Sequence, residues 1–158
     1  MCVAAANYVI NRVNEYNEKY PNARISMTCK RLQKLLYFSD VFFMKQNNGE
    51  SMFRDEFYAW PSGPVIPSVY YGFMKYQSGV MSPIEEENDG ILTEQMIRAI
   101  ESVLEETWEM DTLDLVDFSH VDGGPWRKHY CEVDPNHEQI IPKSDIFAFY
   151  KNCNVFVK

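Results

Sequence analysis

The chain has 158 residues, of which 46% are hydrophobic and 15% aromatic, and its formal net charge is −8. This composition is typical of one globular domain with a substantial core and favours a packed globule over a disordered effector. The first ten residues contain neither a basic segment nor an apolar run long enough to cross a bilayer, so we expect no signal peptide, no membrane helix and a cytoplasmic protein.

Hydrophobic periodicity predicts two long helices in the first third of the chain. The first extends from Val3 to Tyr20 and ends at Pro21. The second begins after Thr28, whose hydroxyl can cap it, and ends at the Asn-Asn-Gly sequence of residues 47–49. Its expected buried stripe is Leu32, Leu35, Leu36, Ser39, Phe42 and Phe43.

The central third mixes strand and helix signals. Residues 52–59 alternate loosely and indicate a short strand or a hairpin arm. A short helix is expected from Pro67 to about Tyr76, closed by residues 78–79, and residues 85–90 are expected to form a loop. Thr93 can cap the next helix. The apolar stripe of that helix is Ile97, Ile100, Leu104 and Trp108.

The last third predicts shorter elements. A helix beginning at Asp111 or Thr112 should end before the break at residues 122–124, and Pro125 can begin a helical turn. Residues 140–141 and 155–157 are possible strands, and residues 142–151 read as a helix. We therefore expect a mainly α fold: residues 1–158 as a single compact domain of about six to seven helices with a small β-hairpin or sheet.

The most distinctive segment is Phe-Tyr-Ala-Trp-Pro-Ser-Gly-Pro-Val-Ile-Pro-Ser-Val-Tyr at residues 57–70. Each proline fixes φ and removes a backbone donor, so this segment cannot be one helix or one central strand. Its aromatic content indicates a packed turn. Together with Leu-Gln-Lys-Leu-Leu-Tyr-Phe at residues 32–38 and the His-x-x-x-x-Pro-Trp pattern at residues 120–126, it resembles the Panacea domain, also described as SocA-like or GepA-like.

This resemblance extends from about Val3 to Tyr150, with Ser119 where threonine is common in the family. It implies an antitoxin that binds and neutralises a cognate protein toxin, and the same resemblance leaves open a role as an adaptor that delivers the toxin to an AAA+ protease. The family does not identify the toxin. A chain of this length has almost no room for a separate DNA-binding domain. The alternatives are a phage or mobile-element protein that binds a non-toxin host protein, and a hydrolase centred on His120.

The residues that carry the resemblance could act in two ways. They could hold the proline turn against the helices, which we rank first because large aromatic residues beside proline turns are usually core. They could instead border a groove for the partner. These residues are Trp60, Pro61, Gly63, Pro64, Tyr70, His120, Pro125 and Trp126.

The negative charge is concentrated between residues 85 and 117. That segment has twelve acidic residues and the single base Arg98, a balance of −11, whereas the remainder has eleven acids and fourteen bases. Such a segment repels phosphate, so we expect no direct nucleic-acid binding there. It is either a solvated surface or a face for a basic partner, with Glu101, Glu105 and Glu109 as the candidate residues.

Sequence motifs for catalysis or metal binding are absent. The three histidines and four cysteines include no CxxC, HxxxH or HExxH spacing, and the cysteines are expected to be reduced thiols. A Ser119–His120 or Cys131–His120 nucleophile pair is conceivable, but no nucleophile elbow or phosphate-binding glycine loop surrounds it. We therefore expect no enzyme activity, no cofactor and no metal.

Overall fold

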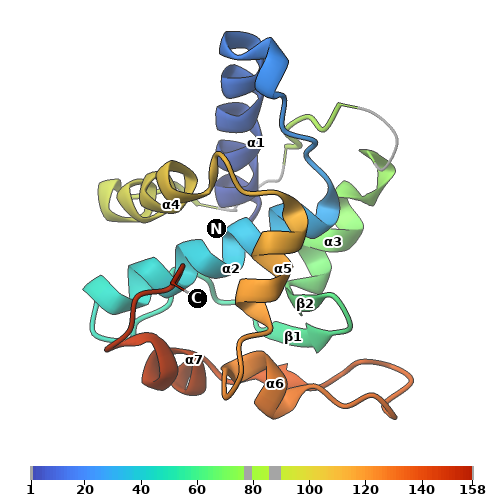
Figure 1. Cartoon of the computed structure of the whole chain (residues 1–158), viewed down its shortest axis with the longest axis vertical. Helices are drawn as coiled ribbons and strands as arrows, with labels where there is room; N and C mark the ends of the chain where they lie inside the picture. The colour runs from blue at the N-terminus through green and yellow to red at the C-terminus, as the bar shows by residue number, and fades with distance from the viewer. Residues whose placement is uncertain (1, 77–79, 86–89, 158) are drawn as a thin grey trace.

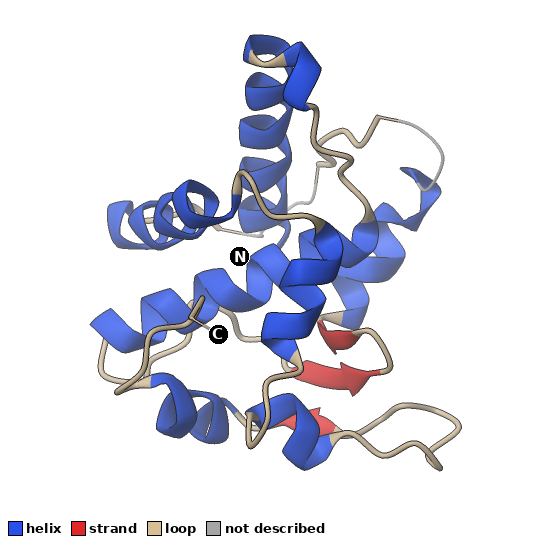
Figure 2. Ribbon diagram, in the orientation of Figure 1, coloured by secondary structure: helices blue, strands red, loops and turns tan. Residues whose placement is uncertain are grey.

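The computed structural model describes residues 2–76, 80–85 and 90–157, and it confirms the expected mainly α fold with a small sheet (Figures 1 and 2). The helices are α1 (Cys2–Lys19), α2 (Cys29–Gln46), α3 (Pro67–Phe73), α4 (Glu94–Thr107), α5 (Thr112–Ser119), α6 (Pro125–His129) and α7 (Lys143–Tyr150). The strands are β1 (Phe57–Trp60), β2 (Gly63–Val65) and β3 (Ile140–Ile141), and short 3-10 turns cover Pro21–Ala23 and Met74–Tyr76. None of the described helices is long and apolar enough to span a membrane.

Helix α2 is the centre of the fold. It contacts α1, α3, α4, α5, α7 and β2 (Figure 1). The Thr28 hydroxyl accepts a hydrogen bond from the Arg31 amide at 3.1 Å, as expected for an N-cap, and Gly49 closes the other end with φ +90°. Every residue from 31 to 41 is buried. The sequence predicted one buried stripe on this helix, whereas the neighbouring helices and β2 leave α2 almost no solvent-facing side.

Burial of residues 31–41 encloses charged side chains of α2, and two of them hold distant segments. Arg31 donates to the carbonyl oxygens of Met110 (2.9 Å) and Thr107 (3.2 Å), where the C-terminal end of α4 favours a cation. Asp40 accepts hydrogen bonds from the Met52 amide (2.8 Å) and the Ser51 hydroxyl (2.6 Å). The arginine therefore fixes α4 on α2, and the aspartate fixes the loop that precedes β1.

The sheet has the order β2-β1-β3 and is antiparallel throughout. Trp60 pairs with Gly63 at the tight hairpin, and Phe57 pairs with Ile141, which brings the C-terminal part of the chain against the hairpin. Phe57 and Ala59 face the core, while Tyr58 and Trp60 are half-buried. Figure 2 shows the three strands together on one side of the molecule, between α5 and α6.

Several sequence expectations need correction. Residues 155–157 form a turn and not a strand, because Phe156 inserts among Phe38, Phe42 and Phe118 with centroid distances of 4.8, 5.8 and 5.4 Å. Helix α4 ends at Thr107, so Trp108 lies just beyond it and stacks on Tyr16 at 4.3 Å. The expected helix stop at residues 78–79 and most of the loop at 85–90 lie outside the described residues.

Candidate partner-binding site at the proline turn

Two side chains of α2 hold the proline turn in place. The Lys34 ammonium donates to the Pro64 carbonyl at 2.9 Å, and the Gln33 side-chain oxygen accepts from the Ile66 amide at 2.8 Å. Gly63 lies between these groups with φ +119°, where a Cβ would come within 2.7 Å of Lys34 Cε and of Ser119 Oγ. Only glycine fits this position, because both the backbone conformation and the space exclude a side chain.

The His-x-x-x-x-Pro-Trp segment reaches the same turn from the other side. Trp126 is 6% exposed, and its indole Nε1 donates to the Trp60 carbonyl at 2.8 Å. The His120 ring stacks on Trp126 with a centroid distance of 3.6 Å and an interplanar angle of 5°. Tyr130 also stacks on Trp126, at 4.6 Å. Pro125 begins α6 and is buried. The structure therefore brings the two motif segments into direct contact.

His120 has the surroundings of a neutral packing residue. Burial, followed by the nearby Lys34 and Arg127 charges, lowers the pKa of His120, and these effects outweigh a backbone hydrogen bond with Ser62. The neighbouring Ser119 hydroxyl donates to the Val116 carbonyl at 2.7 Å. That bond directs the hydroxyl into its own helix, so no Ser119–His120 nucleophile pair is formed.

The candidate residues divide into a buried set and a surface set. Gly63, Pro64, Pro125 and Trp126 are buried. In contrast, Pro61 is exposed, and Trp60 and Tyr70 are half-buried, with their rings 5.1 Å apart in an edge contact. Tyr71 extends this group: it lies 6.0 Å from Trp60 and is 61% exposed. The Trp60 side chain is thus at the surface, although the sequence argument ranked it with the core.

A cavity of about 280 Å³ opens beside these aromatic residues. Its walls are Trp60, Pro61, Ser62, Val65 and Tyr70 on the hairpin side and the first turns of α2 on the other. Helix α2 contributes Thr28, Cys29, Lys30, Gln33 and Lys34. The lining thus contains two lysines and no acidic residue, in a protein whose net charge is −8.

Lys34 is the most unusual residue of this site, and the sequence analysis did not single it out. Its side chain is fully buried, and burial, reinforced by Lys30, lowers its pKa to about 7. Within the part of the chain that the structure describes, its hydrogen-bond partner is the Pro64 carbonyl and no carboxylate pairs with it. The sequence feature that could have indicated Lys34 is the presence of a glutamine and a lysine inside the otherwise apolar segment 32–38, which lies in the fully buried part of α2.

The three acidic candidates do not form one free face. The Glu101 carboxylate accepts hydrogen bonds from Arg12 Nε at 2.6 Å and from the Tyr8 hydroxyl at 2.5 Å, and the Arg12 bond lowers the pKa of Glu101. This carboxylate therefore joins α4 to α1. Glu105 is exposed on α4, and Glu109 is exposed beyond the end of that helix.

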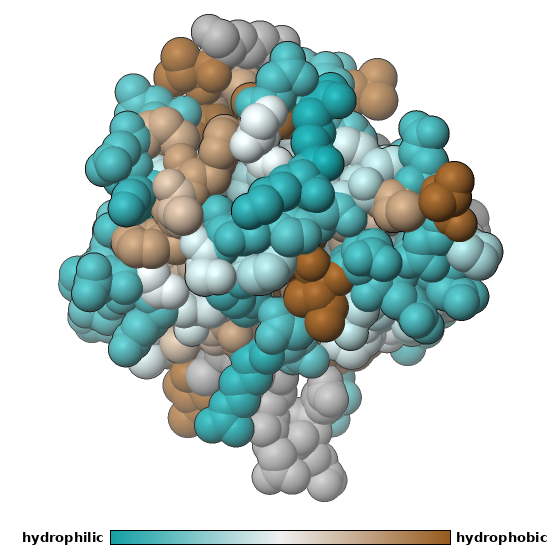
Figure 3. All heavy atoms as spheres, turned by 90° about the horizontal axis from the view of Figure 1, so that it is seen from below, coloured by the Kyte–Doolittle hydropathy of each residue, from teal (hydrophilic) through white to brown (hydrophobic). Residues whose placement is uncertain are grey.

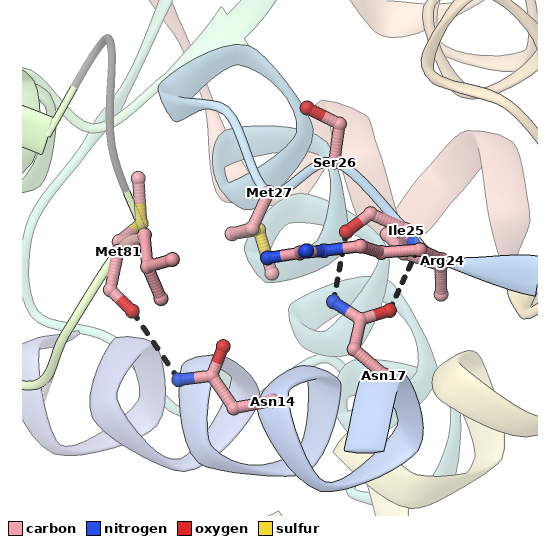
Figure 4. A pocket seen from close by; sticks show the side chains of 8 residues that line it. Asn14, Asn17, Arg24, Ile25, Ser26, Met27 and Met81 are labelled. Atoms are coloured by element: carbon pink, nitrogen blue, oxygen red, sulfur yellow. Dashed lines mark hydrogen bonds between the residues drawn. The ribbon is translucent and has the colours of Figure 1, made fainter. Parts of the chain in front are cut away.

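A second hollow, of about 460 Å³, lies between the C-terminal half of α1 and the loop before α2 (Figure 4). Asn17 exchanges two hydrogen bonds with the backbone of Ile25, at 2.7 and 2.9 Å, and Asn14 donates to the Met81 carbonyl at 3.2 Å. These amides are occupied in fixing loops to α1. The hollow includes none of the residues predicted for the functional site.

Two further observations limit the possible sites. Among the described residues, no group of three or more His, Cys, Asp and Glu side chains is placed to hold a metal ion. The face of the molecule seen in Figure 3 is mainly hydrophilic, with several smaller hydrophobic areas. The cavity beside Trp60 and its aromatic rim therefore remain the strongest candidate for a functional surface.

The chain belongs to the SocA-like antitoxin, Panacea domain family, whose sequence profile matches residues 32–127. That range contains all three motif segments described above and ends one residue after Trp126. The chain is similar to the antitoxin SocA of Caulobacter vibrioides (strain NA1000 / CB15N), with 33% identity over 105 aligned positions; the match covers 60% of this chain and 55% of that protein. It therefore spans about half the length of this curated relative. No solved structure matches the chain significantly.

Proposed function

We propose that the protein is an antitoxin that neutralises a protein toxin by direct binding, without turnover of a small molecule, in the cytoplasm. Family membership supports the antitoxin role. The observation that supports a binding role at the proline turn is the aromatic rim, which is formed by Trp60 on the hairpin and by Tyr70 and Tyr71 on α3 and is partly open to solvent. Aromatic side chains on a rigid support are the anchors that dominate many protein interfaces.

Neutralisation by occlusion needs a contact surface of roughly 800 Å² on each partner. The rim and the cavity beside it would form the centre of such a surface. The buried stack of His120 and Trp126 lies behind the hairpin and would keep Trp60 in position, because the Trp126 indole is bonded to the Trp60 carbonyl. Binding would then require little rearrangement of the hairpin.

The test is co-expression of the protein with the product of the adjacent gene, followed by growth measurement and pull-down. We expect rescue and a physical complex, both weakened by Tyr71→Ala. Tyr20→Ala is the matched control, since Tyr20 is 45% exposed at the C-terminal end of α1 and outside the aromatic rim. Equal losses for the two variants would remove the rim from the proposal.

Delivery of the toxin to an AAA+ protease is a second route to the same outcome. It predicts that toxin half-life falls when the antitoxin is present and recovers when the protease is inactivated. Stable toxin inside a complex would instead support occlusion. Rescue with neither a complex nor degradation would contradict both routes.

The acidic segment supports a different partner class, a basic host protein, because Glu105 and Glu109 remain exposed. Reversal of both to lysine tests this idea. If the acidic segment steers a basic host protein, the association rate with that protein should be lower for the double variant than for the parent. The association rate of the parent should also fall as the salt concentration rises past about 0.15 M. Unchanged association in both experiments would assign these residues to solvation.

A further inference from the structure

Gln33, which lines the cavity beside Trp60, carries a hydrogen-bond donor without an acceptor. Gln33 is completely buried, and its side-chain oxygen is occupied by the Ile66 amide, so the orientation of the side-chain amide is fixed. Its Nε2 has no hydrogen-bond partner among the described residues. A buried donor left without an acceptor destabilises the folded state, and an acceptor entering the cavity would remove that penalty.

The second feature is the charge of Lys34, a fully buried residue that lines the same cavity. Its ammonium uses one donor on the Pro64 carbonyl, and the other donors meet no carboxylate of the described chain. Lys30 adds a second positive charge to the lining, and it is exposed. A buried cation is stabilised mainly by a partner charge, so this cavity is electrostatically prepared for an anion.

The third feature is the N-terminus of α2. Thr28, Cys29 and Lys30 belong to the first turn of this 18-residue helix, and all three line the cavity. The first N–H groups of a helix have no acceptor within it, and the helix dipole adds partial positive charge there. The Thr28 hydroxyl accepts a hydrogen bond from the Arg31 amide, so it does not cap the amides of Cys29 and Lys30.

From these three features we propose that the cavity binds a carboxylate of a polypeptide partner, held by Gln33 Nε2, Lys34 Nζ and the first turn of α2. Lys30 is exposed to solvent, so Lys34 carries the one buried positive charge of the lining; a carboxylate would balance that charge, whereas a phosphate dianion would bring a second negative charge beside it. The walls of Trp60 and Tyr70 would pack on the aliphatic part of the same residue. Because the site lies beside the proposed toxin-binding rim, the inference rests on the proposed function and specifies the chemistry of its partner.

The carboxylate could be the C-terminus of the partner or an acidic side chain, and small probes distinguish the two. N-acetyl-alanine presents a terminal carboxylate, and N-acetyl-glutamate α-methylamide presents a side-chain carboxylate. N-acetyl-alanine amide is the uncharged control. We expect one or both acids to shift the NMR signals of the Gln33 side-chain amide and of the Cys29 and Lys30 amides in the millimolar range expected for such small ligands.

Two variants test the proposed donors. Lys34→Met keeps a long unbranched side chain without the charge, and Gln33→Glu keeps the acceptor for the Ile66 amide while replacing the free donor with a carboxylate. Each should weaken binding of the acids roughly tenfold or more, because a hydrogen bond to a charged group is lost. Lys151→Met is the charge-matched control, since Lys151 is exposed at the end of α7, and it should bind like the parent protein.

Each outcome is decisive. Shifts caused by the acids and abolished by Lys34→Met support the proposal, and the probe that binds more tightly identifies the source of the carboxylate. No shifts at Gln33, equal shifts with the uncharged amide, or undiminished binding to both variants would overturn it. Carboxylate binding in the absence of toxin rescue would contradict the antitoxin function alone, whereas rescue in the absence of carboxylate binding would contradict this inference alone.

Discussion

Substitution of Lys34 by methionine should make stability less dependent on pH. Burial lowers the pKa of Lys34 from 10.5 to about 7 in the folded protein. Between these two values the unfolded chain holds the proton and the folded chain does not, so the folded state gains stability as pH rises. Below about pH 7 both states are protonated, and the whole cost of burying the charge opposes folding.

The expected magnitude follows from this one proton. A full difference of one bound proton changes the free energy of unfolding by about 1.4 kcal/mol per pH unit. Near pH 7 the folded lysine is about half protonated, so the gain from about pH 7 to about pH 9 is about 2 kcal/mol. For a chain of this size that corresponds to a change of roughly 4–8 °C in Tm. Lys34→Met lacks this contribution and, with no charge to bury, should be more stable than the parent near pH 7.

Urea unfolding of the parent and of Lys34→Met across this pH range is the assay. The variant's advantage should shrink by about 2 kcal/mol toward pH 9, because only the parent gains stability from loss of the Lys34 proton. Cys29 titrates in both proteins, so its contribution largely cancels in the difference. Lys34→Met removes one of the charges that lower the pKa of His120, but burial is the larger cause and this histidine titrates below the pH range compared. Lys151→Met, at an exposed site, should keep a constant difference from the parent. A constant difference for Lys34→Met as well would refute the lowered pKa.

Three further predictions concern packing and charge. Trp126→Ala should lower the free energy of unfolding by about 3–5 kcal/mol because the indole is buried and bonded, whereas Trp60→Ala should lower it by only about 1–2 kcal/mol. Equal losses in thermal melts would contradict the surface position of Trp60. Gly63→Ala should lower the free energy of unfolding by at least about 2 kcal/mol, because the position has a positive φ and a Cβ would collide with Lys34 and Ser119. A urea midpoint equal to that of the parent would show that the turn can rearrange to accept the side chain. Glu101→Gln should lower the free energy of unfolding by about 1 kcal/mol, because it breaks the ion pair with Arg12, and Glu105→Gln should lower it by less than about 0.5 kcal/mol. Added salt should narrow this difference. Identical urea midpoints for the two variants would show that the Arg12–Glu101 pair contributes nothing to stability.

Local patterns were sufficient for most elements of the fold. The Thr28 and Thr93 caps, the proline starts of α3 and α6 and the short strand at residues 140–141 lie where the sequence predicted them. The predicted terminal strand at 155–157 was wrong: the Val-Phe-Val sequence is typical of a strand, but Phe156 packs among Phe38, Phe42 and Phe118 and the segment forms a turn.

Long-range contacts explain what the sequence left undetermined at the site. The motif residues were correctly grouped around one turn, but whether each side chain is buried depends on segments far away in the chain. Trp126 is stacked between His120 and Tyr130 and is buried, whereas Trp60 meets Tyr70 and Tyr71 in edge contacts and stays half-buried. Lys34 escaped notice because lysine is rarely buried, and only the packing of several helices around α2 makes it so.

The position of Gln33 and Lys34 on the central helix has a consequence for how such a domain could change its partners. These side chains are bonded to the turn of the hairpin and enclosed by the core, so only side chains of similar size and shape can replace them. Lys30 and Tyr71 are exposed at the first turn of α2 and on α3, where substitutions leave the core intact. New binding specificities would therefore be engineered most readily by randomising exposed positions such as Lys30 and Tyr71 while Gln33 and Lys34 stay unchanged.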